Sequence, residues 1–314
     1  MGTRYSAWGK ESVYGTAVAA SRYAEAIAGI KPDHNWVIPD PVFGRAFRKR
    51  NLGPYRARGP VGPFPVEPEN IGEILLAALG SVSTTNPATG VYLHVFSPAD
   101  LPPSLTVRLG VELTERILPG CLLEDLKLNI PNDKDVEATA QFLSGFPETT
   151  TSIGTPTASA LQALTVASGL TTMTLEGSDR KNVLFDSEIQ IQNKWSDRGN
   201  LGGRTLAVKR IGNRTVLGKL STNFDDVNEY TRFINGTPFT LVHQVAGPEV
   251  IVENYPYYLK LELRKCVYKK DGVPDVKNQG EPLVVDAPFQ AFYDTTGAFN
   301  AEMKATLQNA IVSF

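Results

Sequence analysis

The sequence has few of the residues that build disulfide frameworks and zinc sites, and no long apolar run. Its two cysteines, Cys121 and Cys266, are too few for a disulfide framework, and we interpret them as small buried apolar groups in a reducing compartment. Its three histidines, His34, His94 and His243, stand apart, and none has a second ligand residue at the spacing of a zinc site. No run of eighteen apolar residues occurs, so we expect no membrane span.

Catalytic signatures are missing too. The sequence contains no GxSxG, HExxH, GxxxxGKS/T or GxGxxG motif. Two acidic pairs, Glu124–Asp125 and Asp225–Asp226, could in principle hold a cation. The second pair lies where a helix is expected to begin, and carboxylates there cap the helix and favour its dipole. We therefore predict that the protein is not an enzyme and holds no metal or cofactor.

The composition is that of a globular protein. The chain has 314 residues, enough for one large domain or two of ordinary size, with 42% hydrophobic and 20% charged residues. The net charge is −2, so no overall basic field attracts nucleic acid or anionic lipid.

One stretch organises the rest of the chain. Residues 58–80, RGPVGPFPVEPENIGEILLAALG, combine a short extended segment with an amphipathic helix, and residues 214–236 follow the same plan. The two stretches align without a gap, although few residues are identical. The matched pairs include Arg58 and Arg214, Gly62 and Gly218, Glu73 and Glu229, and Gly80 and Gly236. This pattern predicts one architectural unit built twice.

Three helices are predicted. The first is capped by Glu67 or Asn70 and ends at Gly80, and its apolar face consists of Ile71, Ile74, Leu75, Ala78 and Leu79. The second is capped by Asn223 or Asp225 and ends at Gly236, and its apolar face consists of Val227, Tyr230 and Ile234. The third spans 298–312, with one face formed by Phe299, Met303, Leu307 and Ile311.

Most of the remaining chain alternates as strands do. Strands are predicted at 91–96, 105–113, 123–130 and 136–143, and then at 188–193, 205–211, 216–221, 239–245, 257–268 and 283–292. The last three match 105–113, 123–130 and 136–143 in type and order, so the order of elements recurs. Residues 1–32 are interpreted as an arm, and 81–90 as a turn-rich segment. We predict a mainly β fold of the α+β kind, with two tandem β-sandwich or barrel modules and a flanking helix on each. The first module is 1–145 with its arm, 146–177 is a Thr/Ser-rich junction, and 178–314 is the second module with the C-terminal helix.

A basic cluster lies on a proline-rich, hairpin-like excursion over residues 33–66. With the interleaved Phe47, such a cluster could contact phosphates and stack on bases, or it could contact an acidic surface of another copy. Acidic residues such as Glu112 and Glu115 make the second interpretation the better one for a slightly acidic chain. The predicted interface residues are Arg45, Arg48, Lys49, Arg50, Tyr55, Arg56 and Arg58.

The N-terminal phrase WGKESVYGTAVAASRY, at 8–23, resembles the opening of bacteriophage tail tube proteins. Gly9, Glu11, Tyr14, Gly15 and Thr16 carry this resemblance. The order that follows is similar too: a basic hairpin-like loop, the helix stretch, the segment LHVFSPADLPPSLTVRLG and the strand GCLLEDLKLNI. The resemblance covers most of 8–145, and 178–296 resembles a more diverged second tail-tube module that lacks the opening phrase.

The resemblance implies a tail tube of the long-tailed, siphovirus type, with tail-tube-like β-sandwich or barrel modules. In such tubes, sheets of neighbouring subunits join edge to edge around a channel, and rings stack into the conduit through which DNA is ejected. Three copies of a two-module chain would form a pseudo-hexameric ring. The expected partners are the chain itself, the tape measure protein, the tail terminator and distal tail or baseplate proteins, with DNA passing without sequence recognition. The expected location is the virion tail, assembled in the host bacterial cytoplasm.

Two other functions fit the same patterns. One is another ring-forming tail component, such as a terminator or hub. The other is a carbohydrate-binding β-sandwich, although its exposed aromatic face would have to come from the scattered Trp8, Trp36 and Trp195.

Overall fold

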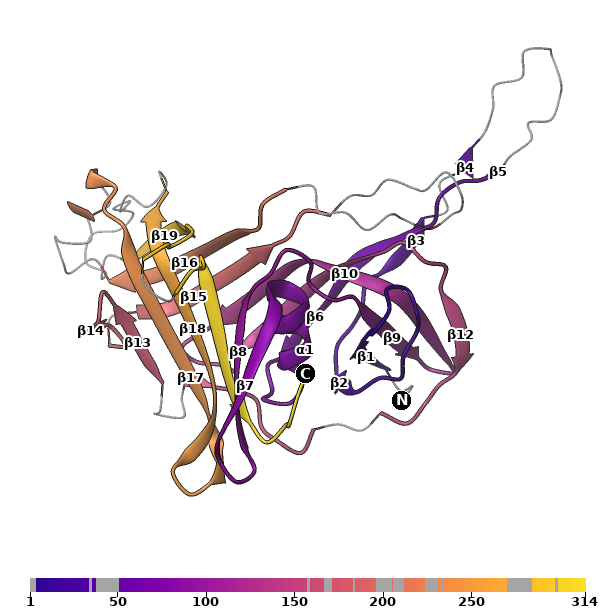
Figure 1. Cartoon of the computed structure of the whole chain (residues 1–314), viewed down its shortest axis with the longest axis horizontal. Coiled ribbons are helices and arrows are strands. Elements are labelled where there is room, and N and C mark those ends of the chain that lie inside the picture. The colour runs from indigo at the N-terminus through magenta and orange to yellow at the C-terminus, as the bar shows by residue number, and fades with distance from the viewer. Residues whose placement is uncertain are drawn as a thin grey trace, which may run out of the picture.

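The fold is almost entirely antiparallel β-sheet, and its strands form one connected, barrel-like network (Figure 1). The computed structural model describes residues 4–33, 36–37, 51–156, 159–166, 171–182, 184–195, 205, 212–223, 231–232, 234–269, 284–296 and 299–314. The prediction of a mainly β fold is confirmed.

One sheet crosses the molecule from the first half of the chain to the second. Its strands, in order, are β3 (Lys31–Asp33), β6 (Arg56–Pro65), β11 (Glu137–Ser144), β10 (Thr114–Ile130), β15 (Leu184–Gln192), β16 (Thr215–Asn223) and β19 (Val284–Ala291). The junction between the two halves is the β10–β15 pair, so both halves share a continuous hydrogen-bonded sheet.

A second sheet also combines the two halves. Its strands, in order, are β7 (Gly80–Ala88), β8 (Val91–Pro98), β20 (Met303–Asn309), β18 (Tyr255–Tyr268), β17 (Phe239–Val252), β13 (Thr172–Leu175) and β14 (Ser178–Asp179). Here the junction is the β8–β20 pair. The segment 81–90, predicted as turn-rich, lies largely in β7, because its β-branched Val82, Thr84 and Thr85 pair with β8.

A third group of strands belongs to the first half alone. These strands, in order, are β2 (Arg22–Ala24), β1 (Arg4–Lys10), β9 (Leu105–Val111), the first part of β10, and β12 (Thr149–Ser152). β1 is thus part of a sheet, not of an arm. The first part of β10 pairs with β9 and β12, and its second part pairs with β11 and β15. The small hairpin sheet of β4 (Trp36–Val37) and β5 (Asn51–Leu52) stands away from the body beyond β3 (Figure 1).

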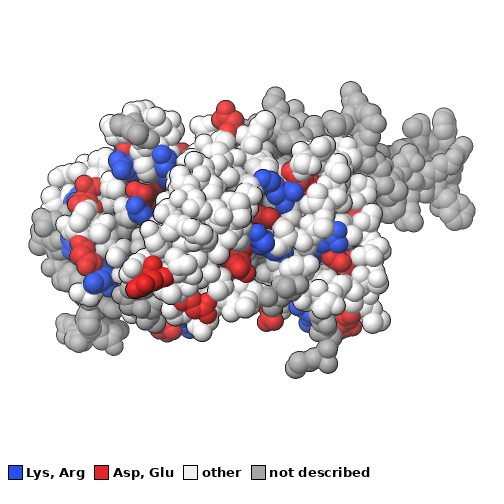
Figure 2. All heavy atoms as spheres, turned by 60° about the horizontal axis from the view of Figure 1, so that its bottom comes forward, with Lys and Arg blue, Asp and Glu red and all other residues white. Residues whose placement is uncertain are grey.

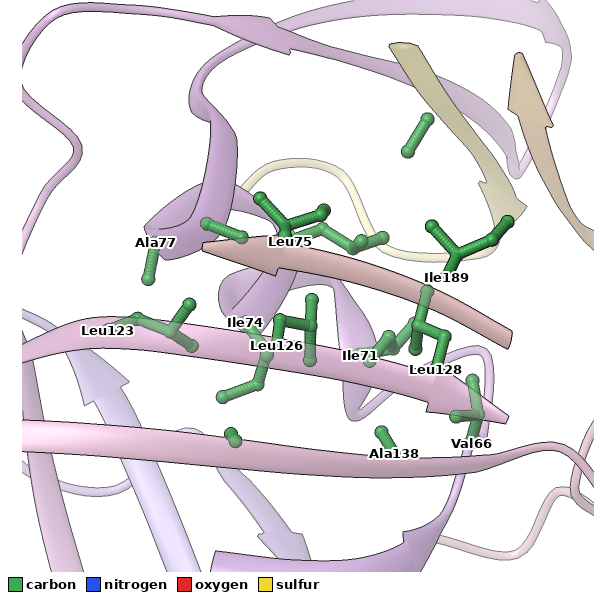
Figure 3. Packing of buried hydrophobic residues seen from close by; sticks show 14 of the residues in the cluster. Val66, Ile71, Ile74, Leu75, Ala77, Leu123, Leu126, Leu128, Ala138 and Ile189 are labelled. Atoms are coloured by element: carbon green, nitrogen blue, oxygen red, sulfur yellow. The ribbon is translucent and has the colours of Figure 1, made fainter. Parts of the chain in front are cut away.

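The helix α1 (Ile71–Leu79) lies inside the molecule, not on its flank. All nine of its residues are buried, and the predicted apolar stripe is therefore only part of its contact surface. Ile71 and Ile74 face Leu126 and Leu128 of β10, and Ile189 of β15 joins the same cluster (Figure 3). Because the helix is apolar nearly all round, it fits a site covered on every side. Both halves of the chain thereby share one core.

The observed ends of this helix lie close to the predicted ones. It ends at Gly80, whose φ of 112° is the left-handed conformation that glycine adopts most readily. At the start, Asn70 is the N-cap residue, but its side chain makes no capping hydrogen bond. Its amide instead donates to the Pro65 carbonyl at 3.1 Å and accepts from the Glu67 backbone N–H at 3.1 Å. Asn70 therefore closes the turn that leads into the helix.

The predicted C-terminal helix is wrong. Residues 303–309 form β20, which lies between β18 and β8. Most of its residues are buried, including Leu307 and Gln308. A strand covered on both faces loses the polar–apolar alternation that marks half-exposed strands. Met, Lys, Ala, Leu and Gln are good helix formers, and pairing on both edges overrides that weak preference.

The second predicted helix is only partly within the described residues. Residues 231–232 and 234–235 are helical, and Gly236 follows with a φ of 60°. Ile234 is 61% exposed, so it does not belong to a buried stripe. Val227 and Tyr230 lie outside the described residues, as does most of the strand predicted at 205–211.

The two halves pair their strands in the same order. In the first half the order is β1–β9–β10–β11–β6–β3, with β12 on the other edge of β10. In the second half it is β13–β17–β18–β19–β16–β15, with β20 on the other edge of β18. Among the described residues of the second half, the β7–β8 hairpin has no counterpart, and Phe239 of β17 follows Gly236 after two residues.

Candidate assembly interface

The predicted basic interface is only partly within the described residues. Arg45, Arg48, Lys49 and Arg50 lie outside them. The other three members, Tyr55, Arg56 and Arg58, lie at the foot of the β4–β5 hairpin, where β6 enters the main sheet. Tyr55 is buried, Arg56 is half-buried and Arg58 is exposed.

Tyr55 belongs to the core. Its side chain is 2% exposed and packs within the main hydrophobic cluster. Burial, followed by the nearby Glu148 carboxylate, raises the pKa of its phenol to about 12. The neutral ring therefore anchors the base of the hairpin to the body of the molecule.

Arg58 is exposed and already paired within the chain. Its guanidinium binds Glu124 of β10 in a bidentate manner, with Nε at 2.5 Å from Oε2 and Nη2 at 2.9 Å from Oε1. The Arg58 side chain is 66% exposed and the Glu124 side chain 12%. The pair ties β6 to β10 across β11, and the outer face of the guanidinium stays open to solvent.

Charges of both signs are interspersed on the described surface shown in Figure 2, where no extended patch of one sign appears. In the part of the chain that the structure describes, no three His, Cys, Asp or Glu side chains gather to hold a metal ion. No helix among those residues is long and apolar enough to cross a membrane.

The β10–β15 junction shows how this chain joins one half to the other. Six residue pairs, from Asp125↔Gln192 to Ile130↔Ser187, form its ladder. The Asp125 carboxylate accepts hydrogen bonds from Gln190 at 2.6 Å and from Gln192 at 3.3 Å. Lys127 and Glu188 form an ion pair at 2.7 Å across the same strands. The junction therefore combines main-chain pairing with polar cross-strand pairs on its exposed face.

The β8–β20 junction is held by a buried histidine. Five residue pairs form the ladder, and His94 is 0% exposed within it. His94 Nε2 is 2.9 Å from the Ile311 carbonyl and 3.1 Å from Asn309 Oδ1, so this nitrogen carries the proton. Nδ1 then accepts from the Thr84 hydroxyl at 2.8 Å. Burial lowers the pKa of His94, which favours this neutral form.

Arg214 locks the end of α1 to the second half. Its Nη2 donates to the carbonyls of Leu79 at 2.8 Å and Ala99 at 3.1 Å, and Nη1 lies 3.5 Å from Glu302. The Arg214 side chain is 4% exposed, whereas Arg58, its match in the sequence alignment, is exposed. The sequence pattern marked both positions, but only burial distinguishes a structural arginine from a surface one.

The N-terminal phrase has a structural explanation centred on Glu11, which is 6% exposed. Its carboxylate accepts four hydrogen bonds, from the Gly15 N–H at 2.8 Å, the Ser104 hydroxyl at 2.6 Å, the Thr106 hydroxyl at 2.7 Å and the Gly120 N–H at 2.8 Å. One carboxylate thus organises the turn after β1 and the bend of β10. Through Glu11, the phrase stabilises the fold.

Two short strands, β3 and β12, present exposed edges on the side of the first half that faces away from the second half (Figure 1). All three residues of β3 and all four of β12 are exposed. Among the described residues, β3 pairs only with β6, and β12 pairs only with β10. Sheet edges of this kind are templates for pairing with another chain. The sequence did not mark them, because their residues carry no distinctive motif.

In the part of the chain that the structure describes, the fold is that of an antiparallel β protein with one shared core and open strand edges. The chain belongs to the phage tail tube protein family, whose sequence model matches residues 4–291. The resemblance inferred from the N-terminal phrase is thereby confirmed, and the protein is a structural component of the virion tail. No curated protein matches the chain.

Proposed function

We propose that this chain contains two tandem tail-tube modules, 1–145 and 178–314, joined by the junction 146–177. The recurrence of seven paired strands in the same order supports this proposal. β12 and β13 lie inside the junction and pair with the first and second halves, respectively. The junction therefore contributes a strand to each module.

Equivalent residues support the same proposal. β10 and β18 each carry a bulge beside a buried cysteine, with Cys121 opposite Leu105 and Cys266 opposite Phe239. Phe142 is opposite Gly59, and Phe289 is opposite Gly218. These pairings make Gly59 the structural counterpart of Gly218. The ungapped sequence alignment had matched Gly218 with Gly62, three positions further along the chain.

A carboxylate beside each β9-type strand adds a further correspondence. Glu11 accepts a hydrogen bond from the Thr106 hydroxyl of β9, and Glu176 accepts one from the Thr240 backbone N–H of β17. Thr106 and Thr240 both directly follow the residue that faces the bulge cysteine. Two modules that share strands, bulges and a carboxylate contact are best explained as copies of one unit.

The modules are proposed to assemble as a pseudo-hexameric ring of three copies, since three chains supply six modules. Stacked rings would form the tail tube through which genomic DNA is ejected into the host. The observation that carries this proposal is the open edge of β12 in a chain of the tail tube family. The net charge of −2 suits a conduit, because a strongly basic wall would retain DNA.

The other proposed partners follow from the same role. The tape measure protein would set tube length, the terminator would close one end, and distal tail or baseplate proteins would bind the other. Assembly would take place in the host bacterial cytoplasm. The second candidate function is that of a ring-forming terminator or hub, which has the same open edges but does not polymerise.

Electron microscopy of the concentrated protein tests this function. Tubes with threefold rings and pseudo-sixfold density support the tail tube assignment. Isolated rings that never stack would support the terminator or hub. A chain that stays monomeric at all concentrations, with and without tape measure protein, would overturn both proposals.

A further inference from the structure

A groove with a volume of about 760 Å³ opens between the two halves of the chain. From the first half it is lined by residues 98–100, which end β8 and follow it. From the second half it is lined by 212–215 at the start of β16, by 290–293 at the end of β19, and by Asn300 and Glu302 before β20. Small-molecule sites in proteins measure roughly 300–1,000 Å³. The groove is therefore large enough to receive an organic ligand.

The walls of this groove are held in place by contacts within the chain. Arg214 joins the two halves beside it through the buried hydrogen bonds and ion pair described above. In the second half, the Asp294 N–H donates to the Ala301 carbonyl at 3.0 Å, which holds residues 292–293 beside 300–302. A site whose walls are fixed before binding loses little conformational freedom when a ligand enters.

Two aromatic rings and three side-chain amides line the groove. Phe292 is 46% exposed and Tyr293 is 56% exposed, so both rings are open to contact. The amides of Asn213, Gln290 and Asn300 make no hydrogen bond to any residue that the structure describes. Each amide can donate hydrogen bonds through its nitrogen and accept them through its oxygen. The groove thus combines flat apolar surface with groups that both donate and accept.

The charges of the groove favour a neutral ligand. Arg214 is the one cation among the described residues that line it, and Glu302 is paired with this guanidinium at 3.5 Å. Asp100 adds a second carboxylate, so a phosphate or another anion would meet more negative than positive charge. An ammonium or guanidinium group would in turn lie close to the Arg214 cation. An uncharged ligand avoids both costs.

We infer that this groove binds a neutral carbohydrate. A pyranose ring has an apolar C–H face, which stacks on Phe292 or Tyr293, and hydroxyl groups around its rim, which pair with the three amides. Of the tryptophans considered from the sequence, Trp8 and Trp195 are buried, so neither supplies an exposed aromatic face. The inference goes beyond the proposed tube function, and it does not depend on assembly, because one chain supplies all the lining residues.

Saturation-transfer NMR on the unmodified, full-length chain is the first test. The probes are maltose, cellobiose and N,N′-diacetylchitobiose, with inorganic phosphate and N-acetyl-arginine amide as charged comparisons in separate titrations. A glycan array of neutral hexose, N-acetylhexosamine and deoxyhexose oligomers extends the set of sugars. We expect binding of at least one neutral saccharide. Absence of binding to every probe and array sugar, or tighter binding of phosphate or the arginine derivative than of any sugar, would overturn the inference.

Variants of the groove are the second test, with the sugar that binds the unmodified chain as the probe. Tyr293→Ala removes a stacking surface and Gln290→Ala removes an amide, and we expect each to weaken binding about tenfold. Tyr255→Ala is the matched control, because it removes the same side chain at the tip of the β17–β18 hairpin, outside the groove. We expect the control to bind as the unmodified chain does.

The outcomes of these tests are distinct from those of the assembly experiment. Unchanged sugar affinity in both Tyr293→Ala and Gln290→Ala would place the sugar elsewhere on the chain and overturn the inference. Thermal unfolding establishes that each variant is folded, and either folded groove variant decides the question if the other is not. Loss of sugar binding leaves tube formation unaffected, and failure of the chain to form tubes leaves the binding result standing.

Discussion

Gly120 and Lys265 occupy the same place in two different hairpins of the chain. Both have positive φ, 65° and 48°, and each directly precedes a buried cysteine at a bulge. The bulge bends β10 so that one strand serves two sheets. In β18 it separates the long β17 ladder from the short pairing with β19. The same positive-φ conformation is thus adopted by a glycine at position 120, where it carries no steric penalty, and by a lysine at position 265.

This relationship predicts unequal effects of substitution at the two positions. Gly120→Ala should destabilise the protein by about 1–3 kcal/mol, because φ is positive and the added Cβ would meet the Phe146 ring at 2.4 Å. Lys265→Gly should change stability by less than about 1 kcal/mol, since relief of strain offsets the loss of the 3.2 Å ion pair with Asp294. Urea unfolding measures both. A Gly120→Ala variant of unchanged stability would contradict the strained bulge.

Glu11→Gln should destabilise the protein by about 2–3 kcal/mol, although the two side chains have nearly the same shape. Every group that contacts the Glu11 carboxylate is a donor, so the new amide N–H₂ would face another donor. Glu112→Gln is the matched control, since the Glu112 side chain is 61% exposed and its ion pair with Arg4 is long, at 3.7 Å. Equal denaturation midpoints for the two variants would refute the organising role of Glu11.

His243 should make stability depend on pH. It is 4% exposed, its Nδ1 lies 2.9 Å from the Ser187 hydroxyl, and burial lowers its pKa to about 4. An unfolded histidine takes up a proton near pH 6.5, whereas the folded one does not, so stability falls as pH drops from about 6.5 to about 4. The contribution of this one group is on the order of 3 kcal/mol at full extent.

The difference between the unmodified protein and His243→Gln isolates this effect. Glu67 acts in the opposite direction, because burial and the nearby Glu69 raise its pKa to about 7, and its protonated form stabilises the fold as pH falls. His243→Gln should retain the Glu67 contribution and lose the histidine contribution. Thermal unfolding between pH 4 and pH 7 measures the slope. Parallel curves for the two proteins would exclude His243 as the source.

Arg214→Gln should destabilise the protein by about 3 kcal/mol, because it leaves Glu302 and the carbonyls of Leu79 and Ala99 without their buried partner. Arg58→Gln, at the position that matches it in the sequence alignment, should cost less than about 1 kcal/mol, because its side chain is 66% exposed. Denaturant unfolding compares the two. A reversed order would show that the exposed Arg58–Glu124 pair contributes more to stability than the buried contacts of Arg214 do.

Charge reversal in the basic cluster tests the interface predicted from the sequence. Replacement of Arg48, Lys49 and Arg50 by glutamate should block self-assembly through repulsion from acidic residues of another copy, without unfolding the monomer. Lys134→Glu reverses an exposed charge between β10 and β11 and serves as the control. Analytical ultracentrifugation gives the readout, and normal assembly of the triple variant would exclude the cluster from the interface.

The alternation of apolar and polar residues and the glycine that ends the first helix predicted much of the fold. β9, β11, β15 and β18 lie where the half-buried pattern placed them, and α1 ends at the predicted Gly80. The prediction failed where tertiary structure overrides local preference. β20 is paired on both edges, so its helix-forming residues are held in a strand.

The candidate site was less accessible to sequence reasoning. A charged cluster such as Arg56 and Arg58 is visible in any sequence, and so is a short phrase such as that around Glu11. The outer edge of β12 is open because no strand among the described residues pairs with it, and only the arrangement of strands reveals this. Cys121 and Cys266 were correctly predicted to be buried, but their equivalence appears only through the residues opposite them.

The β10–β15 junction has a kinetic consequence for a ring of such chains. Every second contact around the ring is already made within a chain, where the effective concentration of the partner module far exceeds that of free protein. A ring of three chains then needs two bimolecular encounters before it closes, instead of the five that six separate modules would need, and incomplete rings of odd module number cannot form. Covalent linkage of two modules would thus set the parity of the assembly before any two chains meet.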